Sequence, residues 1–248
     1  MKSYKNYHTL KTFKISDLKK KATIKASNAA NIAQSFTVVD GYYIVSQMNR
    51  AETVSSIQAY KTSNGKRVNS LSAKFKHGNG MAYNNKTGKI LITNRWGYKT
   101  YWKFSAKDAI SGSKLNYTTH TFSKSISSIE YDRYNNRYYR GTSSISVYDS
   151  NFKRVKSFSK VRSRVSQDIG AYNGVVFAVE DITYYPKKNA IDMYRVSDGA
   201  YLGSYKFDMP SYELESVSWD HQNNELALLF YQSPGKNYIY STKQIKIG

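Results

Sequence analysis

The chain has 248 residues, enough for one large β domain or two small ones, and its hydrophobic fraction of 40% suffices for a folded core. Lys and Arg number 38 against 17 Asp and Glu, a formal net charge of +21. The absence of cysteine excludes disulfides, thiol catalysis and cysteine-ligated metal, and no apolar run approaches the roughly 18 residues of a membrane span.

The start of the chain, Met1 to Leu10, is polar and lacks the apolar core of a signal peptide. If the protein is secreted, we therefore expect the signal to have been removed from a longer precursor. Leu10 to Phe13, with the sequence LKTF, predicts a short strand. Residues 15 to 33, which include the Lys19 to Lys21 run, are expected to connect this strand to the first repeat.

An internal repeat follows and governs the prediction of the fold. Each copy has small or polar residues, an apolar anchor, an Asp, Asn or Gly turn, and an apolar or aromatic strand. The five anchors are 45, 48, 40 and 48 residues apart. The copies are QSFTVVDGYYIVSQ from Gln34, NGMAYNNKTGKILITN from Asn79, SSIEYDRYNNRYYRGT from Ser127, QDIGAYNGVVFAVE from Gln167 and ESVSWDHQNNELALLF from Glu215, anchored on Phe36, Met81, Ile129, Ile169 and Val217.

The turn inside each copy predicts two antiparallel strands. Asp40-Gly41 and Asn173-Gly174 are two-residue hairpin signals, because both residues of such a turn need positive φ. A third strand recurs in a spacing such as Ile57 to Tyr60, and a fourth as VKSF at Val155 to Phe158 and LGSY at Leu202 to Tyr205. Four strands in about 45 residues are typical of a propeller blade.

The fifth copy reaches the end of the chain without a fourth strand. Because LKTF near the start matches VKSF and LGSY, it is predicted to pair with the last blade and to close the ring. The sequence thus predicts an all-β, five-bladed β-propeller with four-stranded antiparallel blades, residues 1–248 forming one domain, and an N-terminal strand completing the last blade.

Three stretches carry a resemblance to a known family. HGNGMAYNNKTGKILITN from His77, QSFTVVDGYYIVSQ from Gln34 and ELESVSW from Glu213 resemble segments of helveticin J-like proteins, the secreted, large bacteriocin-like proteins of lactobacilli. The resemblance covers about half of the chain, which is shorter and more basic than that family. It implies an extracellular protein of a lactic acid bacterium with a target on a bacterial envelope, and it supplies no catalytic residue.

Equivalent repeat positions converge at one mouth of a propeller's central channel, and polar residues occupy them in this chain. The predicted ligand-binding set is Gln34, Asn79, Gln167 and Glu215, with Ser127 at the third position and His77, Asp168 and Glu213 beside them. Their amides, carboxylates and imidazole suit a hydroxyl-rich ligand. The structural alternative is that they satisfy strand ends and channel waters.

Catalysis has less support in the sequence than binding. A glycosidase needs two or three carboxylates around one sugar, and Asp168, Glu213 and Glu215 form the one plausible set. No serine nucleophile elbow, Walker loop, dinucleotide fingerprint or zinc motif occurs. We therefore expect neither a metal nor a cofactor, and a binding activity rather than an enzymatic one.

Basic residues gather around aromatic ones in several segments. These are Arg95 to Lys99, Arg133 to Arg140, Lys153 to Arg164 and Tyr184 to Lys188. Cations neutralise phosphates while Tyr and Trp stack on sugars or bases, although packing between blades and a solvated basic surface would produce the same composition. Trp96 and Tyr98, in a loop after a blade strand, are the predicted exposed platform.

These observations favour an extracellular or cell-surface propeller that recognises an anionic or hydroxyl-rich cell-wall polymer, such as teichoic acid or a polysaccharide, in a bacteriocin-like role. One alternative is a polysaccharide-cleaving glycosidase or lyase that uses the carboxylates at the channel mouth. The other is a nucleic-acid binder, which the charge allows but no recognition motif supports.

Overall fold

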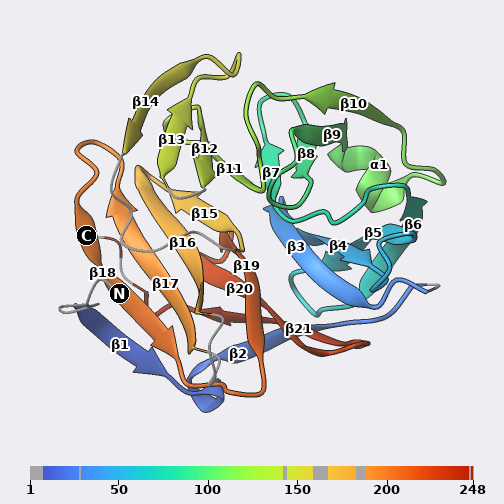
Figure 1. Cartoon of the computed structure of the whole chain (residues 1–248). Coiled ribbons are helices and arrows are strands. Elements are labelled where there is room, and N and C mark those ends of the chain that lie inside the picture. The colour runs from blue at the N-terminus through green and yellow to red at the C-terminus, as the bar shows by residue number, and fades with distance from the viewer. Residues whose placement is uncertain are drawn as a thin grey trace.

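The structure is a computed structural model that describes residues 8–27, 29–141, 144–158, 167–182, 188–245 and 247. Its strands form five sheets in a ring, one for each sequence repeat (Figure 1). The first strand of each repeat is innermost, and inner strands contact one another in the order β3, β7, β11, β15, β19 and back to β3. The predicted five-bladed β-propeller is confirmed.

The first three blades each follow the chain from the channel outward. Blade one consists of β3 (Ile32–Val39), β4 (Tyr42–Met48), β5 (Ser55–Lys61) and β6 (Arg67–Ala73). Blade two consists of β7 (Met81–Asn84), β8 (Lys89–Thr93), β9 (Thr100–Ser105) and β10 (Tyr117–Thr121), with helix α1 (Ala106–Ser111) between the last two. Blade three consists of β11 (Ser128–Asp132), β12 (Arg137–Gly141), β13 (Ile145–Tyr148) and β14 (Arg154–Phe158).

Two blades incorporate strands from the beginning of the chain. Blade four consists of β15 (Ile169–Tyr172), β16 (Val175–Ile182), β17 (Lys188–Arg195), β18 (Tyr201–Phe207) and an added fifth strand, β1 (Thr9–Phe13). Blade five consists of β19 (Glu213–Asp220), β20 (Glu225–Ser233), β21 (Lys236–Thr242) and β2 (Lys19–Ile24). A 3-10 turn, η1 (Ile15–Asp17), joins β1 to β2.

The hairpin turns have the backbone geometry that their sequences predict. Asp40 and Gly41 have φ values of 34° and 92°, and Asn173 and Gly174 have values of 45° and 79°. Asn136 and Asn224 also adopt positive φ, at 52° and 50°, in the longer turns of blades three and five. Short polar residues tolerate this conformation, so the turn chemistry fixes the register of each inner strand pair.

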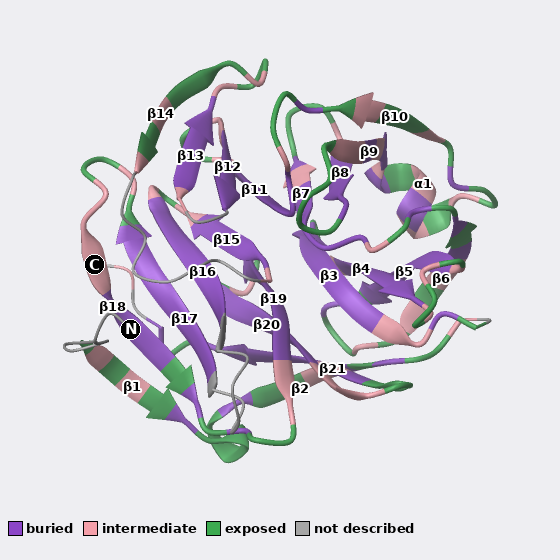
Figure 2. Cartoon of the chain, in the orientation of Figure 1, coloured by how far each residue is buried: buried purple, intermediate pink, exposed green. Residues whose placement is uncertain are grey.

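The hydrophobic core is divided among the interfaces between neighbouring blades. Among the described residues, five clusters of buried side chains each join two adjacent blades. The cluster around Phe36, Tyr43 and Leu229 lies between blades one and five and therefore closes the ring. Figure 2 shows the resulting pattern, in which inner and middle strands are buried while β1, β10 and β14 are largely exposed.

An N-terminal strand completes the last blade, as predicted, but the segment predicted to supply it is wrong. The strand paired with β21 is β2, which contains the Lys19 to Lys21 run that the sequence suggested as a connection. Lys21 Nζ lies 2.6 Å from Glu225 Oε1, and Ala22 and Ile24 are buried. Lys20 Nζ also lies 4.3 Å from the centre of the Tyr238 ring, so the partners of Lys20 and Lys21 come from the other end of the chain and the sequence does not reveal them.

The LKTF segment belongs to β1, which adds in parallel to the outer edge of blade four. Phe13 is completely buried and stacks on Phe207 at a centroid distance of 5.5 Å. Gly203 makes room for this strand, since a Cβ atom there would lie 2.7 Å from Leu10 Cγ. Within the described residues, no helix has the length and apolar character needed to span a membrane.

The two N-terminal strands predict graded effects of truncation. Removing residues 1–14 takes away β1 and the buried Phe13, which costs about 3–5 kcal/mol but leaves the ring closed. Removing residues 1–25 also opens the edge of β21 and leaves the buried Glu225 without Lys21. We expect the first protein to fold with a lower melting temperature and the second to be insoluble or unfolded. Equal melting temperatures for the two truncated proteins would contradict this role of β2.

Candidate functional site

The mouth at which the inner strands begin, which we call the entry mouth, brings equivalent repeat positions together. It is defined by Gln34, Asn79, Ser127, Gln167 and Glu215. Asn79 Nδ2 donates to the carbonyl oxygens of Ser127 at 3.0 Å and Gln167 at 2.6 Å, and so links three blades. The repeat alignment therefore located a true convergence of inner strands.

Most of these side chains are taken up by the fold. Gln34 and Asn79 are each 6% exposed and Glu215 is 4% exposed. Gln34 and Glu215 occupy matching irregularities in the strand register of blades one and five. Gln167, which is partly buried, donates through Nε2 to Glu213 Oε1 at 2.9 Å. The residues of the entry mouth thus mainly hold the inner strands together.

Below the entry mouth, two levels of small residues and single carboxyls line the channel. The residues before the five anchors are Ser35, Gly80, Ser128, Asp168 and Ser216, and those after them are Thr37, Ala82, Glu130, Gly170 and Ser218; all ten are buried. A Cβ atom on Gly80 would lie 2.7 Å from Ser128 Cα, so the inner strands approach too closely for larger side chains.

The two channel carboxyls have perturbed acidities. Burial raises the pKa of Asp168 well above its usual range, although Ser216 Oγ donates to Asp168 Oδ2 at 2.6 Å. Burial also raises the pKa of Glu130, and the nearby Asp168 and Asp132 add to the effect. Glu130 was not among the site residues expected from the sequence. Its signal was an acid one position after the Ile129 anchor, where other blades have Thr, Ala, Gly or Ser.

The carboxylates considered for glycoside cleavage do not present a suitable pair. Asp168 is fully buried, Glu215 is 4% exposed, and Glu213 accepts a hydrogen bond from Gln167. A glycosidase needs two carboxyl groups that face the same sugar. Only Glu213 of the three is partly exposed. Within the part of the chain that the structure describes, there is also no cluster of three or more His, Asp or Glu suited to a metal ion.

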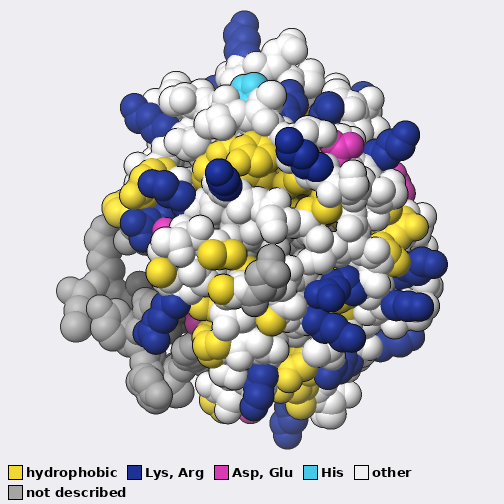
Figure 3. Space-filling view, turned by 90° about the vertical axis from the view of Figure 1, so that its right-hand side faces the viewer, with side chains coloured by type: hydrophobic (Ala, Val, Ile, Leu, Met, Phe, Trp, Pro, Cys, Tyr) yellow, Lys and Arg dark blue, Asp and Glu magenta, His cyan; other side chains and the backbone are white. Residues whose placement is uncertain are grey.

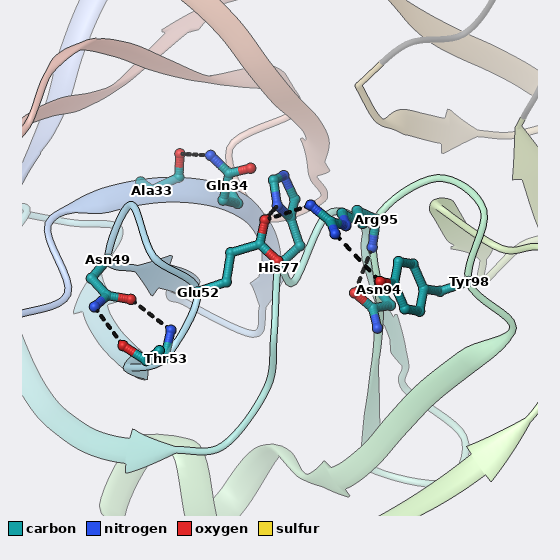
Figure 4. A network of polar contacts seen from close by, with 9 residues as sticks. All are labelled: Ala33, Gln34, Asn49, Glu52, Thr53, His77, Asn94, Arg95 and Tyr98. Carbon is teal, nitrogen blue, oxygen red and sulfur yellow. Dashed lines mark hydrogen bonds and ion pairs between the residues drawn. The ribbon is translucent and has the colours of Figure 1, made fainter.

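An accessible polar network lies beside the entry mouth and connects two features that the sequence suggested separately (Figure 4). Glu52 Oε1 lies 3.0 Å from His77 Nδ1 and 3.0 Å from Arg95 NH1. Arg95 NH2 donates to the Tyr98 hydroxyl at 3.3 Å. Glu52 is a loop residue with φ of 55° that lies outside the repeat pattern, and it was not among the expected site residues.

The loop from Arg95 to Lys99 is anchored from beneath while its aromatic side chains remain accessible. Trp96 is 62% exposed and Tyr98 is 36% exposed. The loop is held to the following connection because Ile126 N donates to Tyr98 O at 2.8 Å and Gly97 N to Ser125 Oγ at 2.9 Å. The predicted exposure of Trp96 and Tyr98 agrees with the structure, and the loop offers a supported stacking platform.

The electrostatic environment of this platform is cationic. Arg95 lies 5.3 Å and Lys76 Nζ 5.7 Å from the centre of the Tyr98 ring. The hydrogen bond from Arg95 and the charges of Arg95 and Lys76 lower the pKa of the Tyr98 hydroxyl. The loop therefore favours negative charge at its surface.

The platform belongs to a wider surface that carries most of the net charge. Residues 61–124 contain 13 Lys and Arg and a single acid, Asp108, which accounts for +12 of the total +21. Eleven of these cations are exposed, and only Arg95 pairs with a described carboxylate. Figure 3 shows the side of the molecule where β6, β10 and α1 lie, with many Lys and Arg and few acids. We call the cations of residues 61–124 the basic face.

The other basic and aromatic segments differ in their position and burial. In Arg133 to Arg140, the side chains of Tyr138, Tyr139 and Arg140 are buried, while Arg133 and Tyr134 lie at the opposite mouth. Arg154 is exposed on the outer strand β14. Residues 159–166 and 183–187, which complete two of the predicted segments, lie outside the described residues.

Comparisons with known proteins identify the architecture. No family model and no curated protein sequence matches the chain. Myxococcus xanthus glutaminyl cyclase is similar in structure, with a TM-score of 0.64 at 11% identity, covering 91% of this chain and 97% of that one. The tail fibre of Staphylococcus aureus phage P68 gives 0.58 at 14% identity, covering 92% and 53% respectively. The RRP9 WD40 repeats give 0.53 at 9% identity, covering 95% and 98%. At these identities, the likeness establishes the propeller fold alone.

The channel acid Glu130 predicts a specific pH dependence of stability. The pKa of Glu130 is higher in the folded state than in the unfolded chain, where it is about 4.3. The contribution of the protonated carboxyl to the free energy of unfolding is therefore complete below about pH 4.3. It is lost as the pH rises through the folded-state pKa. Glu130→Gln should remove this loss. We expect the free energy of unfolding of the variant, minus that of the wild type, to increase with pH in urea titrations. A difference that is constant with pH would contradict the assignment.

Proposed function

We propose that this propeller is an extracellular or cell-surface protein that binds an anionic, hydroxyl-rich cell-wall polymer of the teichoic acid kind. The basic face and the Arg95 to Lys99 loop form the binding surface. The observation that carries the proposal is the concentration of 13 cations and one acid in residues 61–124. A charge spread only for solubility would not need such asymmetry.

The arrangement around the loop supports a phosphate-containing polymer with sugar or polyol units. Lys76 and Arg95 flank the Tyr98 ring, and Lys99 and Lys124 are exposed on the two segments that hold the loop. Such cations neutralise phosphates, while the exposed Trp96 provides a face for stacking. The resemblance to helveticin J-like proteins favours an envelope polymer over nucleic acid as the source of the phosphates.

Matched charge variants test the location of the surface. The triple variant Lys76→Gln, Lys99→Gln, Lys124→Gln removes three exposed cations around the loop. The control Lys153→Gln, Lys206→Gln, Lys243→Gln removes three exposed cations elsewhere, so both proteins lose the same net charge. With delipidated poly(glycerol phosphate) teichoic acid, we expect the first variant to bind at least about tenfold more weakly. Its slope of log K against log salt should be shallower by about 0.7 for each lost phosphate contact.

The remaining outcomes decide against the proposal. Equal weakening by both triple variants would indicate a response to overall charge without a localised site. Tighter binding of duplex DNA than of teichoic acid at the same salt concentration would favour the nucleic-acid function. Equal binding of the wild type to cell walls with and without teichoic acid at low salt would show that phosphates contribute nothing to recognition.

A loss of stacking provides a second test of the same surface. Trp96 is 62% exposed, so Trp96→Ala should leave the melting temperature within about 1 °C of the wild type. We expect it to weaken teichoic acid binding several-fold in calorimetric titrations. The comparison variant Val155→Ala changes another exposed apolar residue, on β14, and should bind as the wild type does. Unchanged binding by Trp96→Ala would remove the aromatic platform from the proposed site.

A further inference from the structure

The opposite end of the channel, which we call the turn mouth, is formed by the inner hairpin turns and has a different chemistry. All five blades contribute to it, through Asp40, Tyr83, Arg133, Tyr134, Tyr172, Trp219 and His221. Tyr172 stacks on Trp219 at a centroid distance of 4.2 Å, and Tyr134 meets Tyr172 edge to face at 5.2 Å. Tyr134 is 58% exposed, so the outermost ring of this stack faces solvent.

Two polar atoms beneath these rings have no hydrogen-bond partner among the described residues. They are Trp219 Nε1 and His221 Nδ1, and both are shielded from solvent. Trp219 is 6% exposed. Both residues line a cavity of about 10 Å³ that also reaches Glu130. This volume suits one hydroxyl group or one water molecule, and a buried N–H without an acceptor destabilises the unliganded protein.

The rim of the turn mouth carries a charged pair that extends across the opening. Arg133 NH2 lies 3.4 Å from Asp40 Oδ1, although the two residues belong to the non-adjacent blades three and one. The Tyr83 hydroxyl donates to Asp40 Oδ2 at 3.0 Å. The Asp40 side chain is 58% exposed, so its carboxylate retains accessible lone pairs beside the guanidinium donors.

The charged groups around His221 differ from those of the basic face. Asp40, Asp132 and Asp220 act on His221 together with the single cation Arg133. Burial and Arg133 lower the pKa of His221 to about 4, so the imidazole is neutral near pH 7 and offers both a donor and an acceptor. Aromatic rings with excess carboxylate could attract a quaternary ammonium group. Such a group has no hydroxyl for Trp219 Nε1 or His221 Nδ1.

We propose that the turn mouth is a second binding site, for a neutral pyranose unit of a glycan. The sugar ring stacks on Tyr134, neighbouring hydroxyls bind Asp40 and Arg133, and one hydroxyl or a bridging water satisfies the polar atoms of Trp219 and His221. Planar aromatic surface with a few fixed donors and acceptors is the composition of a small-molecule site. This site is independent of polyanion binding and lies at the other end of the channel.

The indole N–H signal of Trp219 reports directly on this site. In the ¹H–¹⁵N NMR spectrum, the signal is assigned by its loss in Trp219→Phe. Cellotetraose, maltotetraose and the N-acetylglucosamine tetramer are then titrated at millimolar concentrations, with tetramethylammonium chloride in a separate titration. We expect at least one saccharide to shift the Trp219 signal with a saturable curve. Because Tyr134→Ala removes the ring on which the sugar stacks, the variant should bind that saccharide at least about fivefold more weakly.

Tyr98→Ala, at the entry mouth, is the matched control. It should leave saccharide binding unchanged, whereas Tyr134→Ala should leave teichoic acid binding unchanged, so the two proposals fail separately. Melting temperatures check that both variants are folded. The proposal is overturned if no saccharide shifts the Trp219 signal, if Tyr134→Ala binds the sugar as the wild type does, or if tetramethylammonium alone shifts the signal.

Discussion

The free edges of the five inner strands impose the constraint on which the rest of this structure depends. An inner strand pairs on one side only, and its other edge faces a narrow channel where every polar group needs a partner. Side chains of other blades supply those partners: Phe36 N and Val38 N donate to the hydroxyls of Ser216 and Ser218. The Asn79 amide caps two carbonyls in the same way. The polar residues at the entry mouth are therefore largely committed to holding the ring.

Because the polar side chains of the channel hold the ring together, the accessible polar groups lie at its two rims. Turns between paired inner strands favour Asp, Asn and Gly, so the turn mouth gathers Asp40, Asp132 and Asp220. Loops between the second and third strands, and between blades, have no such requirement and emerge at the entry mouth, where Arg95 and Lys124 lie. The two ends of the ring thus carry different polar groups, with exposed cations at the entry mouth and the aspartates of three hairpin turns at the other end.

Closure of the ring combines apolar and charged contacts from distant parts of the chain. The cluster between blades one and five includes Ala22 and Ile24 from β2 together with Leu229 and Ile239 from blade five. The Lys21–Glu225 pair lies at the same junction, with both side chains less than 10% exposed. A buried ion pair contributes little by itself but makes the correct strand position specific, because a shifted register would leave Glu225 uncompensated.

The sequence by itself determined the number of blades, their inner strand pairs and the hairpin turns that join them, because apolar anchors and turn residues act over a few neighbouring positions. It also located the convergence at the entry mouth and the exposed Trp96 and Tyr98. Only the tertiary structure decided which N-terminal segment closes the ring, since LKTF and KKKATI both suit an outer strand and their partners lie about 200 residues away. The Glu52 network and the aromatic turn mouth also required it. Their residues come from different blades, and no local pattern records which side chains a closed ring brings together.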